Sequence, residues 1–371
     1  MALSLPDPGS GMDRVYGCLI AGAVGDALGA PVEGDSYQQI RDSHGKVTEL
    51  MDHDIAYTEQ QPGAVTDDTH LRHYLCYAIV NHGGRITPEE YGKVWVEDLN
   101  PDRLWINEEL VQLKLKARMN PWTAGKGTIP AGVASMAIEP IGIINAGNPR
   151  QAYQDAFNIS FVNQDGPNRD AAAAVAAGVA EALSPDATAD SVIETITDQC
   201  LGGHHTGTFA RSLDLTLRLA DNCETVDEFV ERFYDELLDY TWPAVHWDAE
   251  SYEAGELFSG NSHEFVPAAI GLLKFHTGDP NETIIEGASF GRDCDTIAKV
   301  VGNFVGALEG ANKVNIDWIE TVETVMEPFF EELEGDPQAN FYSMAERMYQ
   351  ALEAEADRAA QREAELRTIL E

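Results

Sequence analysis

Residues 13–28 have the sequence DRVYGCLIAGAVGDAL, and their apolar side chains keep largely to one side of a helix. The same stretch holds the small residues Gly22, Ala23, Gly25 and Ala27. Glycine costs about 1 kcal/mol relative to alanine in a helix interior, so a helix that keeps several glycines must gain from close backbone approach. A second predicted helix, at residues 295–308, contains Gly302, Gly306 and Ala307, and Gly310 follows it. We therefore expect these two helices to cross near the centre of a helical bundle.

Helical periodicity continues through the rest of the chain, whereas strand signals are scarce. Further helices are expected at residues 68–80, 170–183, 226–238, 266–274, 295–308 and 318–333. Pro328 is expected to kink or split the last of these helices. No internal repeat or domain linker is visible, so the sequence predicts one all-α domain over residues 12–350. Residues 351–371 form a mixed-charge segment that we expect to be either a solvated terminal helix or a partner helix for self-association.

The charge of the chain excludes two classes of partner. Its 371 residues carry a formal net charge of −39, from 63 acidic and 24 basic residues. Such a charge repels nucleic-acid phosphates and anionic membranes, so neither is expected as a partner. No run approaches about 18 apolar residues, and no signal peptide is visible at the N-terminus. The five cysteines show no zinc-ligand spacing, so a cytoplasmic, reduced protein is the simplest expectation.

The acidic excess is spread along the chain, and only eight of the basic residues are lysines. A dispersed acidic surface with little lysine suits a protein that must stay hydrated in concentrated salt. We therefore expect a halophilic cytoplasm, although an acidic protein of an ordinary cytoplasm is the alternative reading of the same charge.

Two short segments each place two carboxylates and a hydroxyl at the start of a predicted helix. These residues are Thr66, Asp67 and Asp68 in the first segment, and Asp293, Asp295 and Thr296 in the second. Taken singly, each segment is an ordinary helix cap. Together they offer six hard oxygen ligands, which suit Mg²⁺ or Mn²⁺. Two such ions close together can bind adjacent hydroxyls and orient a water molecule.

A third segment, residues 25–33, has the sequence GDALGAPVE. Pro31 is expected to end the preceding helix, which places Glu33 on a loop. Loops that follow a rigid helix often carry catalytic residues, but a glutamate on a loop is more often only solvated.

In this order and spacing, the three segments resemble the ADP-ribosylglycohydrolase family. The likeness runs from about residue 13 to residue 313 and is specific at residues 22–29, 66–69 and 291–296, followed by 302–310. It implies an orthogonal helical bundle with a cleft that holds two Mg²⁺ (or Mn²⁺) ions. It implies the six oxygen-bearing residues above as the metal ligands, and it places Glu33 at the catalytic glutamate of the family.

The resemblance also implies a reaction, which is the hydrolysis of a ribosyl N- or O-glycosidic bond. The two metals are expected to bind the ribose hydroxyls and to orient one water, while Glu33 serves as acid and base at the bond that breaks through an oxocarbenium-like state.

The chain departs from the family pattern where members contact ADP-ribose. An Asn-Gly-Ser stretch is replaced by Gly132-Val133-Ala134, and the arginine of a following motif is replaced by Ala137, with Glu139 just before Pro140. A Thr-His pair is replaced by residues 160–166, SFVNQDG. A diphosphate seeks Arg, Lys or backbone N–H groups. The expected substitute is the stretch Gly125, Lys126, Gly127 and Thr128, which could cradle a phosphate or form a simple turn.

Three functions follow from these features. The first is removal of ADP-ribose from a modified acceptor, with a small-molecule or ADP-ribosylated substrate as partner. The alternative is an N-glycosidase that acts on a nucleoside-like ribosyl compound without a diphosphate. The third is a metal-binding protein without activity, since some relatives of this fold are structural lens proteins; the complete set of ligand residues and Glu33 argue against it. Self-association into a homo-oligomer is left open.

We expect the chain to need concentrated salt for complete folding. The Debye length falls to about 3 Å at 1 M salt, which screens the repulsion among surface carboxylates. Circular dichroism across a salt titration measures this, and a fully stable chain in dilute buffer would contradict it.

Overall fold

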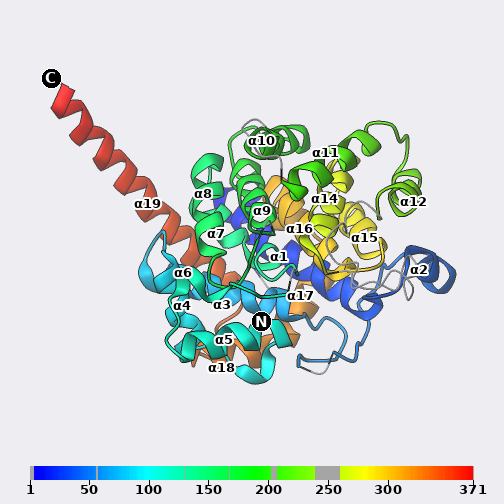
Figure 1. Ribbon diagram of the computed structural model, residues 1–371, viewed down its shortest axis with the longest axis horizontal. Helices are drawn as coiled ribbons and strands as arrows, with labels where there is room; N and C mark the ends of the chain where they lie inside the picture. Colours follow the sequence, from blue (N-terminus) through cyan, green and yellow to red (C-terminus); the bar gives the residue numbers. More distant parts are fainter. Residues whose placement is uncertain are drawn as a thin grey trace.

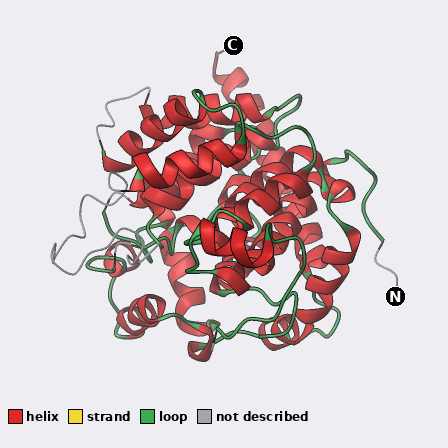
Figure 2. Cartoon of the chain, turned by 90° about the vertical axis from the view of Figure 1, so that its right-hand side faces the viewer, coloured by secondary structure: helices red, strands yellow, loops and turns green. Residues whose placement is uncertain are grey.

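The computed structural model describes residues 4–55, 57–129, 131–166, 168–201, 207–238 and 260–370. Within these ranges every regular element is a helix, and the strand-like contact recorded there is an isolated antiparallel bridge between Ser36 and Gly291. Figure 2 shows the resulting assembly of helices and connecting loops. The prediction of an all-α fold is confirmed.

The helices of the first half are α1 (Gly11–Gly29), η1 (Ala30–Val32), α2 (Tyr37–His44), α3 (Asp67–His82), α4 (Pro88–Glu97), η2 (Pro101–Arg103), α5 (Ile106–Lys116), α6 (Pro121–Ala124), η3 (Ser135–Ala137), α7 (Glu139–Ile144), α8 (Pro149–Ile159) and α9 (Asn168–Ala182). Those of the second half are α10 (Ala189–Leu201), α11 (Thr208–Ala220), α12 (Val226–Glu236), α14 (Ser262–Leu273), α15 (Pro280–Ala288), α16 (Cys294–Glu309), η4 (Ala311–Lys313), α17 (Ile316–Val325), α18 (Glu327–Glu334) and α19 (Phe341–Leu370).

The two glycine-rich helices cross at the centre of the molecule, as predicted. α1 makes its most extensive helix contact with α16, and Figure 1 shows both in the middle of the bundle with other helices around them. A Cβ atom on Gly17 would collide with the carbonyl oxygen of Gly306, and a Cβ atom on Gly306 would collide with the carbonyl oxygen of Gly17. Gly25 lies in the same way against the backbone of Ala298. Only glycine permits this backbone separation.

Proline and glycine set several helix ends where the sequence places them. Pro328 lies in the first turn of α18, and the predicted 318–333 segment is split there into α17 and α18. Gly310, with φ of 84°, ends α16, and its backbone N–H bonds to the carbonyl of Gly306. Gly310 therefore sets the C-terminal end of the helix that crosses α1.

A buried ionic cluster joins four helices behind the crossing. Lys299 of α16 donates to the Glu139 carboxylate of α7 at 2.7 Å, and Arg72 of α3 lies 3.5 Å from the same carboxylate. Arg72 also donates to the carbonyl of Leu19 in α1 at 3.0 Å. All three charged side chains are fully buried, so each depends on its partners for solvation.

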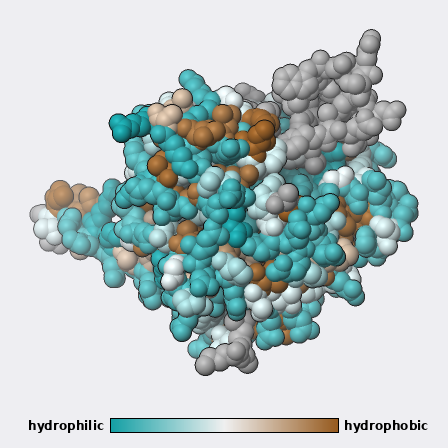
Figure 3. Space-filling view, turned by 90° about the horizontal axis from the view of Figure 1, so that it is seen from below, coloured by the Kyte–Doolittle hydropathy of each residue, from teal (hydrophilic) through white to brown (hydrophobic). Residues whose placement is uncertain are grey.

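The C-terminal helix α19 leaves the body of the protein. Its first part is packed through Phe341, Met344, Ala345, Met348 and Ala351. Its second part projects into solvent at the left of Figure 1, and apolar residues colour its tip in Figure 3. α19 is continuous from Phe341 to Leu370, so the helix has no break at the predicted division at residue 351. Ala351 is the last buried residue of this helix. That division stays a prediction.

One segment, Gly11–Val32, is long and apolar enough to cross a membrane by length and composition, although no such run was expected. The structure buries 94% of its most apolar window inside the protein. This segment is therefore buried core, formed by α1 and η1.

We expect Gly306→Ala to destabilise the fold by up to about 2 kcal/mol. An alanine in a helix interior should by itself stabilise by about 1 kcal/mol, but a forced backbone shift in a packed core costs about 1–3 kcal/mol or more. The free energy of unfolding from denaturant titration measures the balance. An unchanged or raised value would show that the crossing tolerates a methyl group.

Candidate metal centre

Backbone pairing brings the loop after α1 to the start of α16. The N–H of Gly34 donates to the carbonyl of Arg292 at 2.8 Å, and the N–H of Arg292 donates to the carbonyl of Asp35 at 2.6 Å. The isolated bridge between Ser36 and Gly291 extends this pairing. As a result, carboxylate oxygens of Glu33, Asp293 and Asp295 all lie within 4.8 Å of one another.

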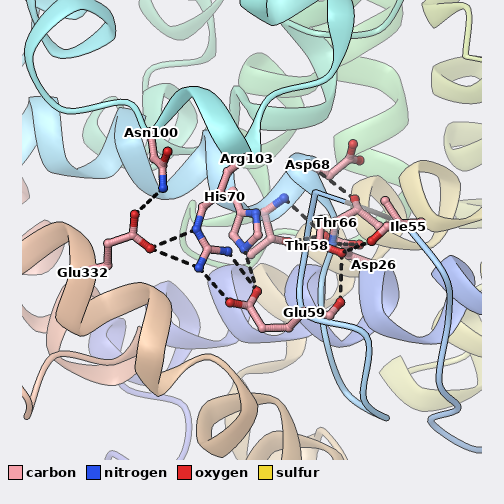
Figure 4. Close-up of polar contacts among 11 residues, drawn as sticks. Asp26, Ile55, Thr58, Glu59, Thr66, Asp68, His70, Asn100, Arg103 and Glu332 are labelled. Carbon is pink, nitrogen blue, oxygen red and sulfur yellow. Dashed lines mark hydrogen bonds and ion pairs between the residues drawn. The ribbon is translucent and has the colours of Figure 1, made fainter.

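The start of α3 is fixed to α1 by one buried carboxylate. Asp26 accepts hydrogen bonds from the N–H of Thr66 at 3.0 Å, from the N–H of Thr69 at 3.2 Å and from the Thr69 hydroxyl at 2.5 Å. Thr66 is the N-cap of α3, and its hydroxyl accepts from the N–H of Asp68. Figure 4 shows Asp26, Thr66 and Asp68 together at this end of the helix. Asp26 therefore positions the turn that carries Asp67 and Asp68.

The start of α16 is held in an uncommon backbone conformation. Arg292 has φ of 62°, which is rare for a residue with a side chain, and it follows Gly291 with φ of 81°. The buried guanidinium of Arg292 forms an ion pair with the buried carboxylate of Glu264 in α14. This ion pair and the backbone pairing stabilise the turn that presents Asp293.

The orientation of the next three residues follows from that turn. The hydroxyl of Thr296 donates to Asp293 Oδ1 at 2.9 Å. Cys294 is directed the other way, with its sulfur 3.5 Å from the carbonyl oxygen of Gly29. Asp293, Asp295 and Thr296 therefore face one side of α16, and the thiol faces the other.

One pocket collects most of the residues named from the sequence. Its lining includes Glu33, Asp67, Asp68, Asp293, Asp295 and Thr296. Thr66 is buried behind the lining, with its hydroxyl engaged by the N–H of Asp68. The remaining walls are apolar or aromatic and come from Tyr57, Trp105, Ala131, Gly132, Val133, Met136, Gly260 and Phe265.

Burial is the main influence on the pKa values of these carboxyl groups, and it raises them. The pKa of Glu33 rises to about 8, because its surroundings dehydrate the carboxyl group and because Asp293, Asp67 and Asp26 repel its charged form. The pKa of Asp293 rises to about 6 through burial, with further repulsion from Glu264 and Asp67. The pKa values of Asp68 and Asp295 rise well above the ordinary range for the same two reasons. The cluster as a whole disfavours its own negative charge.

The donor set fits hard divalent cations. One oxygen of Asp68 and one of Asp295 are buried without a hydrogen-bond partner among the described residues. The N-termini of α3 and α16 both meet at the cluster, which favours negative charge there but does not supply a partner for every oxygen. Carboxylate and hydroxyl oxygens are the ligands that Mg²⁺ and Mn²⁺ prefer, and a cation would reverse the repulsion among them.

A further carboxyl group contacts the cluster from α5. The Glu108 side chain is fully buried beside Asp67, and one of its oxygens accepts from the N–H of Trp105 at 3.0 Å. Burial and the neighbouring Asp67 raise the pKa of Glu108 well above the ordinary range. The sequence contains only a weak signal for this residue, because Glu108 occupies a capping-box position that is common at helix starts.

The turn of residues 125–128, expected as a phosphate cradle, lies outside the lining of the carboxylate pocket. Its four backbone N–H groups donate within the chain, to Phe161, Thr123, Asp165 and Gly125 in order. None of Gly125, Lys126, Gly127 or Thr128 lines the carboxylate pocket. Phosphate binding by this segment stays a prediction, with a simple turn as the alternative, and the side chain of Lys126 is exposed.

Buried amides occupy the region where the family pattern differs. Asn163, Gln164 and Asn168 donate to the carbonyls of Val133, Ile129 and Ala131, and Asn107 accepts from the N–H of Ile129. These side chains therefore hold Ile129 and residues 131–133, and residues 131–133 form one wall of the pocket. Glu139, the acidic departure near Pro140, is buried against Lys299 and adds no charge to the rim.

The loop before α3 carries Tyr57 to the pocket and is held by an ion pair. Glu59 accepts two hydrogen bonds from Arg103 of η2, at 3.1 and 2.8 Å, and lies 3.5 Å from a ring nitrogen of His70. Arg103 also bonds to Glu332 of α18 (Figure 4). Because Glu59 is two residues from Tyr57, this network limits where the tyrosine can lie.

The chain is similar to known proteins over most of its length. A sequence profile of the ADP-ribosylglycohydrolase family matches residues 7–358. An uncharacterized protein of Escherichia coli (strain K12), YegU, is 22% identical over 82% of this chain and 90% of its own length. An uncharacterized protein of Archaeoglobus fulgidus is 24% identical over 86% of this chain and 94% of its own length. A solved structure described as an ADP-ribosylglycohydrolase-related protein complex has the same fold, with a TM-score of 0.66 and 18% identity over 92% of this chain and 99% of that chain.

We expect Mg²⁺ to raise the melting temperature more at pH 8 than at pH 5. Carboxyl groups whose folded pKa is raised, such as Glu33 at about 8, destabilise the cation-free fold as pH rises from about 4.5 to about 8. A bound cation favours their charged form and removes this penalty. Thermal unfolding with and without Mg²⁺ across that pH range measures the difference. The Asp295→Asn variant is the control, in which the difference should shrink; an equal effect of Mg²⁺ in both proteins would place the cation elsewhere.

Proposed function

We propose, because the chain belongs to the ADP-ribosylglycohydrolase family, that its carboxylate pocket removes ADP-ribose from a modified acceptor. The family and the fold make the chain a glycoside hydrolase. The proposed reaction is hydrolysis of a ribosyl N- or O-glycosidic bond with two Mg²⁺ (or Mn²⁺) ions as cofactors.

The convergence of Glu33 with two aspartates of α16 is the observation that supports this proposal. Their carboxylate oxygens come within 4.8 Å of one another, although Glu33 and Asp293 are far apart in the sequence. Asp67 and Asp68 line the same pocket from α3. We propose Thr66, Asp67 and Asp68 as ligands on one side, and Asp293, Asp295 and Thr296 on the other.

Glu33 is the residue that we propose to exchange protons with the substrate. Its side chain is partly open to solvent at the edge of the cluster, although neighbouring groups dehydrate its carboxyl group, whereas the aspartates are deeper. Its carboxyl group can donate a proton to the leaving group, and its carboxylate can accept one from the attacking water. The cations, when bound, supply a fixed positive charge that holds two ribose hydroxyls and lowers the pKa of water.

The walls of the pocket complete the proposed site. Tyr57 and Trp105 offer flat apolar faces beside the carboxylates, where a sugar or base can pack. The wall at residues 131–133 is fixed by buried amides, so it can exclude water from the reacting bond without moving.

One observation favours the second candidate function. The residues that line the pocket include no lysine or arginine, and the N–H groups of residues 125–128 are already engaged. A diphosphate would therefore find few partners among the described residues of the pocket. A nucleoside-like ribosyl compound has no diphosphate and would need no such partners. An N-glycosidase acting on such a compound is therefore the alternative. Competition by free ADP-ribose, compared with ribose or a nucleoside, distinguishes the two.

We expect Glu33→Gln to lower kcat by about 10²–10⁴-fold, because it removes the acid and base but keeps the size of the side chain. Mass spectrometry should detect release of ADP-ribose from modified peptides by the unaltered chain only when Mg²⁺ is present. Glu320→Gln, at an exposed glutamate of α17, is the matched control and should turn over normally.

Two outcomes would change this assignment. Normal turnover by Glu33→Gln would end the catalytic role of Glu33. Release of ribose or a free base, with modified peptides left intact, would support the N-glycosidase instead.

A further inference from the structure

Helix α5 exposes a continuous apolar stripe. Ile106, Leu110 and Leu113 follow one another at helical spacing and are 65%, 40% and 55% exposed. The opposite face of α5 is packed through Val111 and Leu115. The stripe is therefore not the core face of the helix, and folding alone does not require apolar residues there.

The same region holds further exposed apolar side chains. Ile129 and Met119 are 41% and 43% exposed. Elsewhere in the described residues, the large exposed apolar side chains are Val96, Ile316, Leu366, Ile369 and Leu370. Half of the set thus falls within residues 106–129, whereas the surface seen in Figure 3 is mainly hydrophilic. Gathered apolar surface of this kind marks an interaction site.

The stripe begins at the edge of the carboxylate pocket. Trp105, which lines the pocket, directly precedes Ile106. The N–H of Ile129 bonds to the Asn107 side chain at 3.0 Å, which places Ile129 beside the first turn of α5. Two residues later, Ala131 also lines the pocket. A molecule that covers Ile106 and Ile129 therefore lies at the entrance to the site.

The charge around the stripe is opposite to that of the whole chain. Residues 105–129 contain the basic residues Lys114, Lys116, Arg118 and Lys126 against Glu108 and Glu109, a net charge of +2, in a chain with a net charge of −39. Glu108 is buried, so the exposed side chains of this segment are more basic still, although Asp165 beside Gly127 and Glu89 beside Trp122 contribute negative charge from neighbouring segments. Lys114 donates to the carbonyls of Ala124 and Lys126, which holds the Lys126 turn against α5. Such a surface is complementary to an acidic partner.

We propose that this surface docks an acidic protein that carries the modified residue, and that the modified residue then enters the adjacent pocket. The docking surface consists of Ile106, Leu110, Leu113 and Ile129, with Lys116, Arg118 and Lys126 at its border. The apolar stripe anchors the partner, and the basic residues select for negative charge. This inference rests on the proposed removal of ADP-ribose from an acceptor.

The test compares acceptors that differ only outside the modified residue. The probes are mono-ADP-ribosylated ovalbumin as the acidic protein, mono-ADP-ribosylated lysozyme as the basic protein, and an ADP-ribosylated tripeptide, all with the same ADP-ribosyl linkage. The variants are Leu110→Ser with Leu113→Ser, and Lys116→Glu with Arg118→Glu. The matched controls are Ile316→Ser and Lys93→Glu, which change an exposed isoleucine and an exposed lysine on other helices.

We expect each double variant to raise KM for modified ovalbumin by about tenfold or more, with kcat unchanged, because central apolar and charged contacts dominate binding energy. KM for the tripeptide should stay the same, and KM for modified lysozyme should be high in the unaltered chain. The two controls should match the unaltered chain. Circular dichroism at the assay salt concentration confirms that each variant is folded.

Three outcomes would overturn the inference or its premise, and they are distinguishable. Equal KM for ovalbumin in all variants would show that α5 does not dock acceptors. A dimer in sedimentation velocity that becomes a monomer in Leu110→Ser with Leu113→Ser would assign the stripe to a second copy of the chain. Failure of the unaltered chain to cleave any of the three probes would instead refute the proposed function.

Discussion

The close contact between α1 and α16 is the constraint on which the site depends. Gly17, Gly25 and Gly306 let the two backbones touch, and Gly29 lies against the backbone of Asp295. The end of α1 then delivers Glu33, and the start of α16 delivers Asp293 and Asp295, to one place. A side chain in the crossing would separate these two ends. The glycines therefore affect the chemistry only because they set the distance between Glu33 and the two aspartates of α16.

Electrostatic repulsion is the cost of this arrangement. The carboxyl groups lie at helix N-termini, where the backbone favours negative charge, but burial and mutual repulsion still raise their pKa values. Behind them, Lys299 lowers the pKa of Asp68 while it is itself paired with Glu139. Since this buried cation is already neutralised, most of the repulsion remains for an external cation to relieve.

Much of the fold, and the convergence of the site, could be predicted from the sequence. Helical periodicity with few strand signals indicated the all-α class, and the small residues indicated the central crossing. The segments around Asp67 and Asp293 could be assigned to one site because each holds an uncommon number of oxygen ligands within a few residues. Glu108 and the amide of Asn163 could not, because a capping glutamate or a loop amide looks the same whether it faces solvent or a buried site. The engaged N–H groups of residues 125–128 depended on Phe161 and Asp165, partners that local sequence does not reveal.

The contact between Gly17 and Gly306 also bears on how this sequence can change over generations. In most packed cores a larger residue on one helix can be accommodated when a neighbour becomes smaller. Here both partners already have the smallest side chain, and each would collide with the backbone of the other. No compensating substitution at either position exists, so a lineage that loses one glycine cannot recover the crossing by changing the second. The exposed end of α19 has no such partner, and its residues are free to drift one at a time.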